Sequence, residues 1–242
     1  MACFVFDGVD FGEELEVASI EMGALPETTP DMRYAPGRDG AEMTDNRLEP
    51  LEIKIKARLV TDTIDERDIQ RRWAEVAARL RTGEPRPLSL SEGKHWLAVL
   101  TDKSPLTFKT YSATAELTFI CPDPIAYGIE RTVTVPSGGS VTFNVGGTYN
   151  AKPKIEAQAT RNASSLVWGI RLDEGDYIHV ATGSDSARSV VLDCKERTCL
   201  VNSSVALPTL DSDWLELKPG THTLRNDAGT GAATVAFTER WL

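Results

Sequence analysis

The chain has 242 residues, with a hydrophobic fraction of 41% and a charged fraction of 26%, values typical of a globular protein and not of a disordered or fibrous one. Its formal net charge of −10 argues against a protein that grips nucleic acid by its phosphates, because such binding needs clustered lysine and arginine. No run of about 18 apolar residues occurs, so we expect no membrane span.

The first residues, MACFVFDGVDFGEELEV, do not resemble a secretory signal. They lack a basic leading segment, and they carry carboxylates at Asp7, Asp10, Glu13 and Glu14, where such a signal has an apolar core. We therefore expect synthesis in a cytoplasm, an environment that keeps thiols reduced.

A stretch rich in turn residues, YAPGRDGAEM, occupies positions 34–43. Its glycines follow proline and aspartate in dipeptides typical of tight turns, where glycine supplies the positive φ. On physical grounds this segment is a structural turn in which the arginine pairs with a neighbouring carboxylate. The motif consists of Pro36, Gly37, Arg38, Asp39 and Gly40.

Two segments of this first half alternate apolar and polar residues with the period of two typical of a strand with one wet face. They are residues 51–59, LEIKIKARL, and residues 113–120, ATAELTFI. Between them we predict one helix, which begins at Asp65 as the N-cap and stops at Gly83. Its apolar stripe toward the core consists of Ile69, Trp73, Val76 and Leu80, which recur at helical spacing.

Five arginines lie on the same predicted helix: Arg67, Arg71, Arg72, Arg79 and Arg81. We interpret them as a solvated face, and the alternative is a contact surface for an acidic partner.

A domain boundary is predicted where the second strand runs into Pro122, Asp123 and Pro124, because two prolines end strand pairing. We assign residues 1–126 to a first domain of α+β class, in which one helix covers a mainly antiparallel sheet. Residues 127–242 form the second domain. The pair makes the chain mainly β.

The second domain shows no helical pattern and many short β-rich runs separated by turn residues, which is typical of a two-sheet β-sandwich. The predicted strands are 132–135, 141–145, 154–159, 166–172, 177–181, 190–193, 214–217 and 234–237. Cys194 and Cys199 bracket a predicted hairpin loop and could face each other across its strands. Like Cys3 and Cys121, they are interpreted as reduced, buried or half-buried residues.

Motifs for chemistry are missing. The three histidines, His95, His179 and His222, show no metal-ligand spacing, and no glycine-rich phosphate loop occurs. We therefore predict no cofactor, no metal and no enzyme. The five tryptophans leave one alternative open, a carbohydrate-binding β-sandwich module, although packing is the commoner role of such side chains.

Several short motifs, in this order, resemble the distal tail protein family of long-tailed bacteriophages. The first domain carries FDGVD at 6–10, GRDG at 37–40 and TFICPDPIAY at 118–127. The second carries GTYNAKP at 147–153, VVLDC at 190–194, LELKPG at 215–220 and FTERW at 237–241.

The resemblance implies a structural protein of the virion, located at the distal end of the phage tail and made in the bacterial host. Members of this family form a hexameric ring in which the first domain makes the wall and a galectin-like β-sandwich projects outward. Implied partners are copies of the chain itself, the major tail tube protein, the end of the tape measure, the tail hub and receptor-binding proteins. Six copies would carry a charge of about −60, and an acidic lumen would let DNA pass without specific binding.

Overall fold

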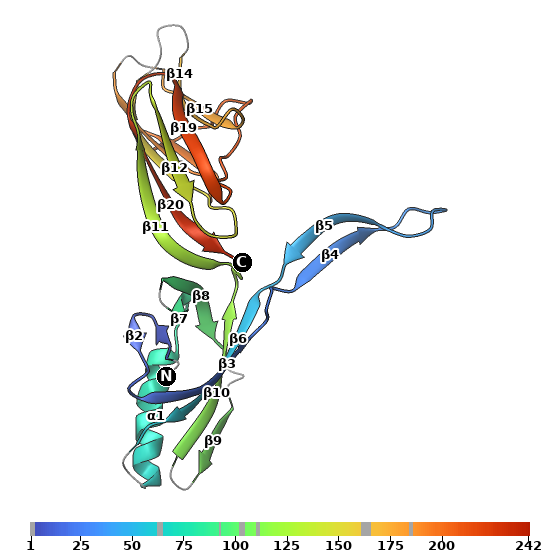
Figure 1. The fold of residues 1–242 in the computed structure, drawn as a ribbon, viewed down its shortest axis with the longest axis vertical. Coiled ribbons are helices and arrows are strands. Elements are labelled where there is room, and N and C mark those ends of the chain that lie inside the picture. The colour runs from blue at the N-terminus through green and yellow to red at the C-terminus, as the bar shows by residue number, and fades with distance from the viewer. Residues whose placement is uncertain are drawn as a thin grey trace. The chain divides into compact units, whose positions relative to one another are not determined.

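The computed structural model describes residues 3–61, 65–91, 93–101, 105–109, 112–160, 166–183 and 186–242. The chain divides into two compact units, Met1–Ala126 together with Leu242, and Tyr127–Trp241. Each unit has its own buried core. Figure 1 labels the elements of both units. The fold is mainly β, as predicted, and the described residues contain a single helix.

The elements of the first unit are β1 (Val5–Phe6), β2 (Val9–Asp10), β3 (Leu15–Met22), β4 (Thr28–Arg33), β5 (Glu42–Leu48), β6 (Leu51–Leu59), α1 (Glu66–Leu80), β7 (Arg86–Ser91), β8 (Lys94–Leu100), β9 (Leu106–Lys109) and β10 (Ser112–Cys121). The main sheet is antiparallel in the order β8-β10-β6-β3. β1 pairs with β2 and with β7, which continues to β8, and β9 pairs with β10.

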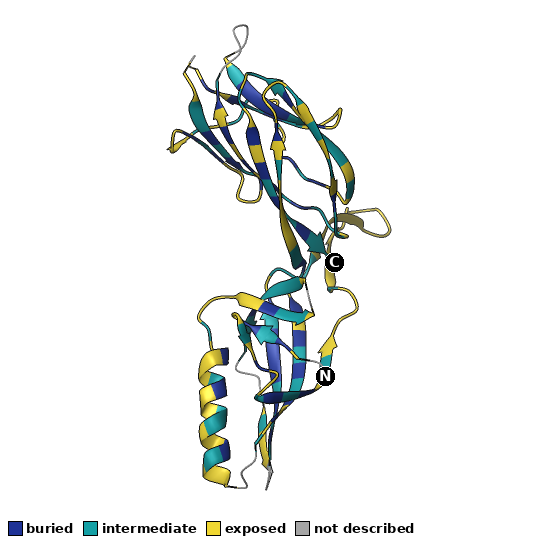
Figure 2. Ribbon diagram, turned by 60° about the vertical axis from the view of Figure 1, so that its left-hand side comes forward, coloured by how far each residue is buried: buried dark blue, intermediate teal, exposed yellow. Residues whose placement is uncertain are grey.

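The central strand β6 shows why the alternating pattern works. Ile53, Ile55 and Ala57 are fully buried on one face, and the charged residues between them lie on the opposite face. The buried face shares a core with residues of α1 and with Phe4, Phe6, Phe11 and Phe119. Figure 2 colours the buried segments dark blue.

Helix α1 begins where the sequence predicts. The Asp65 side chain accepts a hydrogen bond from the backbone N–H of Arg67 at 3.0 Å, so Asp65 is the N-cap. Ile69, Val76 and Leu80 are buried, and Trp73 is half-buried against the same core.

The predicted stop at Gly83 is wrong. The helix ends at Leu80, because Arg81 adopts an extended backbone while its N–H still donates to Ala77 O at 3.1 Å. Gly83 lies beyond this cap and is not among the glycines with positive φ.

The connection between the units lies between β10 and β11. Pro122, Asp123 and Pro124 follow Cys121, and the Asp123 carboxylate accepts the backbone N–H of Ile125 at 3.2 Å. The division of the chain falls directly after this segment, between Ala126 and Tyr127.

The strands that build the second unit are β11 (Ala126–Val135), β12 (Ser140–Val145), β13 (Lys154–Ala159), β14 (Val167–Leu172), β15 (Tyr177–Ala181), β16 (Arg188–Asp193), β17 (Thr198–Val201), β18 (Ser204–Val205), β19 (Gly220–Ala228) and β20 (Ala233–Trp241). One sheet has the order β18-β17-β16-β13-β20-β11 and the other β12-β19-β14-β15. Trp168 and Leu224 from one sheet share a core with Ile155, Leu192 and Val235 from the other, so this unit is a β-sandwich.

Two expectations for the second unit are wrong. Residues 214–217 form no strand, because only Leu217 makes an isolated bridge, with Ala151. In the β16–β17 hairpin Cys199 stands opposite Leu192, not Cys194, and both thiols are free and buried in the core.

Candidate assembly surfaces

The first candidate surface is the hairpin formed by β4 and β5, which pair only with each other among the described strands. Every residue of β4 is exposed, as is nearly all of β5, and the hairpin appears yellow in Figure 2. Met32, Tyr34 and Met43 are 49%, 75% and 58% exposed. A separate two-stranded ribbon is marginal in water, so such a hairpin needs another surface to pack on.

The predicted turn motif lies at the tip of this hairpin. Gly37 and Gly40 have φ of +76° and +85°, with open space around them, and the other three motif residues are exposed. Within the described part of the chain Arg38 forms no ion pair, so the predicted local pairing is wrong. The tip is a reversal of the chain that presents polar groups to solvent.

Sequence reasoning found this turn and missed the strands on both sides of it. β4 reads TTPDMR and β5 reads EMTDNRL, so neither strand shows the apolar alternation of a half-buried sheet. The available signal was the methionine on each side of the turn, since Met32 and Met43 stand directly opposite each other.

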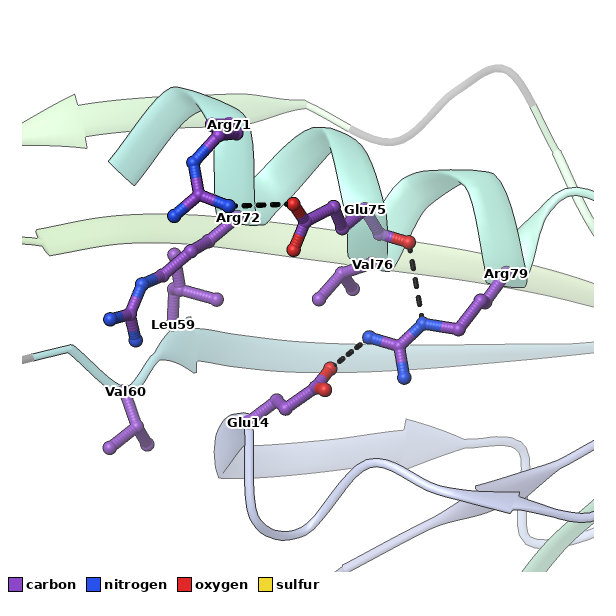
Figure 3. A pocket seen from close by; sticks show the side chains of 8 residues that line it. All are labelled: Glu14, Leu59, Val60, Arg71, Arg72, Glu75, Val76 and Arg79. Atoms are coloured by element: carbon purple, nitrogen blue, oxygen red, sulfur yellow. Dashed lines mark hydrogen bonds and ion pairs between the residues drawn. The ribbon is translucent and has the colours of Figure 1, made fainter. Parts of the chain in front are cut away.

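The second candidate surface is a groove of about 250 Å³ between α1 and the end of β6 (Figure 3). Its apolar lining comes from Leu59, Val60 and Val76. Its polar lining is the set Arg71, Arg72, Arg79, Glu14 and Glu75.

Ion pairs hold most of this charged lining in place. Arg71 contacts Asp68 at 2.6 Å and Glu75 at 2.8 Å, and Arg79 pairs with Glu14. The hydrogen bond from Arg71 keeps the pKa of the Asp68 carboxyl below its usual value. Three of the five arginines that the sequence singled out, Arg71, Arg72 and Arg79, both form ion pairs and line the groove.

The exposed face of the main sheet carries a row of ion pairs across β3, β6 and β10. Lys56 lies 2.7 Å from Glu21 and 3.9 Å from Glu116, and Arg58 pairs with Glu16. Pairing with Glu21 raises the pKa of Lys56, and the same contact lowers the pKa of Glu21. This face is charged but locally balanced.

Two of the histidines pair with carboxylates. His179 Nε2 lies 3.0 Å from Asp227 Oδ1, and Ser212 Oγ contacts the backbone of His179, not its ring. His222 Nδ1 lies 2.7 Å from Asp173 Oδ2. No group of three or more potential metal ligands occurs in the described ranges.

Four of the five tryptophans lie in or against the cores. Trp168 is fully buried, Trp73 and Trp96 pack against the first core, and Trp214 packs against the second. Trp241 is half-buried, with its indole nitrogen beside Gly128. The feature that favoured a sugar-binding module therefore serves packing. No helix in the described ranges is long and apolar enough to cross a membrane.

Comparison with known proteins matches both units. Residues 12–121 match the model of the phage tail protein RIFT-related domain, and residues 146–241 match that of the siphovirus-type tail component, C-terminal domain. The distal tail protein of Bacillus phage SPP1 is 26% identical, over 98% of this chain and 95% of its own.

A solved structure has the same fold. The crystal structure of the SPP1 Dit protein, described as a paradigm of the hub adsorption apparatus in phages that infect Gram-positive bacteria, aligns with a TM-score of 0.80 at 20% identity over 100% of both chains. A chain of the phage P2 baseplate in its activated conformation aligns over 97% of both chains, with a TM-score of 0.47 at 7% identity. With both domain models matched in order along one chain, this protein belongs to the siphovirus-type tail component family of distal tail proteins.

Proposed function

We propose that this chain is a structural subunit of a phage tail tip and that six copies assemble into a ring. Family membership supports the role in a tail. The observation that carries the assembly is the β4–β5 hairpin, which exposes Met32, Tyr34 and Met43 and pairs with no other described strand. Exposed apolar groups on such a ribbon favour a protein interface.

The two domains would divide the work. Residues 1–126 would form the ring wall, because this unit carries the hairpin and an antiparallel sheet that can contact the sheet of a neighbouring copy. Residues 127–242, a sandwich of the galectin-like kind, would form an outward platform for partners. A ring of copies needs a heterologous interface, in which one surface of each copy contacts a different surface of the next copy. Repeated rotation by the same angle then closes the ring.

The proposed partners follow from this position. One face of the ring would meet the tail tube protein and the end of the tape measure, and the other would meet the tail hub. Receptor-binding proteins would attach through the second domain. The protein would be made in the host cytoplasm and reside at the distal end of the tail.

We propose a structural role and not catalysis. The His179–Asp227 and His222–Asp173 pairs resemble parts of a catalytic triad, but the contacts of the nearby Ser212 hydroxyl are to backbone and to Thr209. In a catalytic triad the serine hydroxyl forms a hydrogen bond to the histidine ring, which acts as the base. The contacts of Ser212 do not include this hydrogen bond.

Electron microscopy of the purified full chain tests the assembly. We expect rings with sixfold symmetry, and we expect them to disappear when residues 24–49 are replaced by a short Gly-Ser turn that leaves β3 and β6 paired. Circular dichroism of the variant serves as the folding control. A full chain that shows no rings at high concentration contradicts the proposal.

The carbohydrate-binding alternative predicts a different result. A sugar-binding module would stay monomeric and would bind defined oligosaccharides on a glycan array. We expect no saturable binding on such an array together with ring formation. Saturable binding by a monomeric protein would favour the alternative.

A further inference from the structure

We propose that the second unit binds an extended segment of a partner protein along strand β12, and that a lysine or arginine of this segment inserts its side chain against the carboxylate of Glu239. The inference rests on the proposed role of the second domain as a platform for partners, and it names the surface that would receive one. All residues of this surface belong to the one compact unit Tyr127–Trp241.

The site is a groove of about 480 Å³ lined by residues of β11, β12 and β20, which we call the edge groove. Its apolar lining comes from Val133, Phe143 and Phe237. The rings of the two phenylalanines have their centroids 5.4 Å apart. An apolar lining of this kind can hold the methylene stem of a long side chain.

A buried carboxylate lies in the same groove. Glu239 is 6% exposed, and it is the only charged residue that is buried in the described ranges of the chain. Its Oε1 accepts a hydrogen bond from Arg131 Nε at 2.6 Å. Its Oε2 makes no hydrogen bond or ion pair with any described residue. A buried carboxylate oxygen in this state is costly unless it is paired, so a bound cation would stabilise it.

Gly146 makes the space that this carboxylate occupies. A Cβ atom at Gly146 would lie 2.6 Å from Glu239 Oε1 and 2.8 Å from Oε2. The carboxylate therefore rests directly against the backbone at the end of β12, beside Phe143 and Asn144 of the same groove.

The charges of the groove select a cation. Glu130 adds a second carboxylate, and Arg131 is the only cation of the lining among the described residues, so an excess negative charge remains. Arg131 is itself 52% exposed and occupies one oxygen of Glu239. A second ammonium or guanidinium group can bind the other oxygen, and the neighbouring aromatic rings also favour a cation.

The burial of Glu239 selects a long side chain. The apolar residues Val133 and Phe143 of the same groove are half-buried, whereas Glu239 is almost fully buried. Lysine and arginine carry their charge at the end of a long apolar stem, so they can contact these apolar residues and still reach the carboxylate.

Strand β12 supplies the backbone part of the site. It is the last strand of its sheet and pairs with β19 but with no other described strand. An open edge offers N–H and C=O groups to an extended chain, which then adds to the sheet as a further strand. Phe143 and Asn144 belong both to this edge strand and to the groove lining. A segment that pairs with β12 would therefore place one of its side chains in the groove.

Peptide binding to the full chain tests the site. An array of random hexapeptides is probed with labelled protein, and the dissociation constant of the best-bound peptide is measured by fluorescence anisotropy. We expect lysine or arginine at one fixed position, and at least tenfold weaker binding when norleucine, which keeps the stem of lysine without its charge, replaces it. Bound peptides that lack a basic residue, or an array without bound peptides, would overturn the inference.

Two variants should change this binding in opposite directions. Glu239→Gln removes the buried charge and should weaken binding of the selected peptide about tenfold, whereas Arg131→Gln removes the competing guanidinium and should tighten binding about threefold. The matched control is Glu156→Gln, which removes a carboxylate that pairs with Lys154 at 2.7 Å outside the edge groove. It should leave the dissociation constant within about twofold, and equal effects of all three variants would overturn the assignment.

Measuring ring formation on the same proteins separates this inference from the proposed function. Rings that form while Glu239→Gln binds the peptide as tightly as the natural sequence would overturn the edge groove as a site and leave the ring standing. A chain that stays monomeric and still binds the peptide through Glu239 would contradict the ring and support the site.

Discussion

At the scale of single residues, Asp173 links two parts of the second unit through its carboxylate. Its Oδ1 accepts the backbone N–H of Thr223 at 2.7 Å, and its Oδ2 contacts His222 Nδ1 at 2.7 Å. The hydrogen bond to His222, followed by that to Thr223, holds the pKa of Asp173 below its usual 3.8. A lowered pKa means that the folded state prefers the charged carboxylate.

The sign of the pH dependence follows from that preference. The contribution of Asp173 to stability is fully present above its unfolded pKa near 3.8 and is lost as the pH falls through the lower folded value. We predict that Asp173→Asn lowers the free energy of unfolding by about 1 kcal/mol at pH 7, a modest effect because the side chain is half-exposed. Asparagine tolerates the positive φ of this position, so the backbone should hold.

Urea unfolding at pH 7 and at pH 3 measures the difference. The difference in the free energy of unfolding between the Asp173→Asn variant and the natural sequence should be smaller at pH 3 than at pH 7. A gap that stays constant would show that the carboxylate charge does not stabilise this turn.

The four thiols should differ in reactivity. Burial raises the pKa of Cys121 and Cys194 to about 12 and that of Cys199 to about 11. Cys3 is exposed. We predict that a thiol reagent at pH 8 modifies one thiol quickly, since the thiolate is the reactive species, and the other three only on unfolding. Absorbance of the released reagent counts the thiols, and Cys3→Ser should abolish the fast phase.

At the scale of elements, the sequence predicted those helices and strands that bury an apolar face within the single chain. Helix α1 and strand β6 follow the apolar periods that their burial requires, and the Asp65 cap lies where it was expected. The predicted C-terminal end of the helix, at Gly83, was wrong because Arg81 adopts an extended backbone conformation and ends the helix before it reaches the glycine.

Strands that show no alternation of apolar and polar residues were not predicted. β19 reads GTHTLRNDA, with Leu224 and Asn226 as its buried side chains, so its pairing with β12 and β14 carries no apolar alternation. Nearly every residue of the β4–β5 hairpin is exposed, so its two strands show no alternation of buried and exposed residues. The contacts that we propose to order it lie on another copy of the chain, which a single sequence does not reveal.

One glycine of the second unit should prove indispensable to its fold. Gly147 has φ of +99°, and a Cβ atom there would lie 2.2 Å from the carbonyl oxygen of Arg240. We predict that Gly147→Ala destabilises the protein by about 3 kcal/mol, since both the backbone and β20 would have to shift. Gly175→Ala is the control, because a Cβ atom there meets open space. Thermal unfolding of the two variants compares them, and equal melting temperatures would contradict the prediction.

At the scale of the whole molecule, the net negative charge of the protein opposes the binding of polyanions such as DNA. A formal net charge of −10 repels polyanions, and the exposed face of the main sheet balances its lysines and arginines with carboxylates. We predict no retention of duplex DNA in a gel-shift assay at 50 mM salt, where electrostatic binding is strongest. Retention that weakens steeply with added salt would reveal a basic surface that DNA can reach.

The account rests above all on assembly through unit 1, and the native mass of the purified full chain tests that most directly. Mass photometry across a range of concentrations should reveal a species with six times the 26.5 kDa mass of one chain, lost when the hairpin is removed. A protein that keeps the mass of a single chain at every concentration would contradict the account.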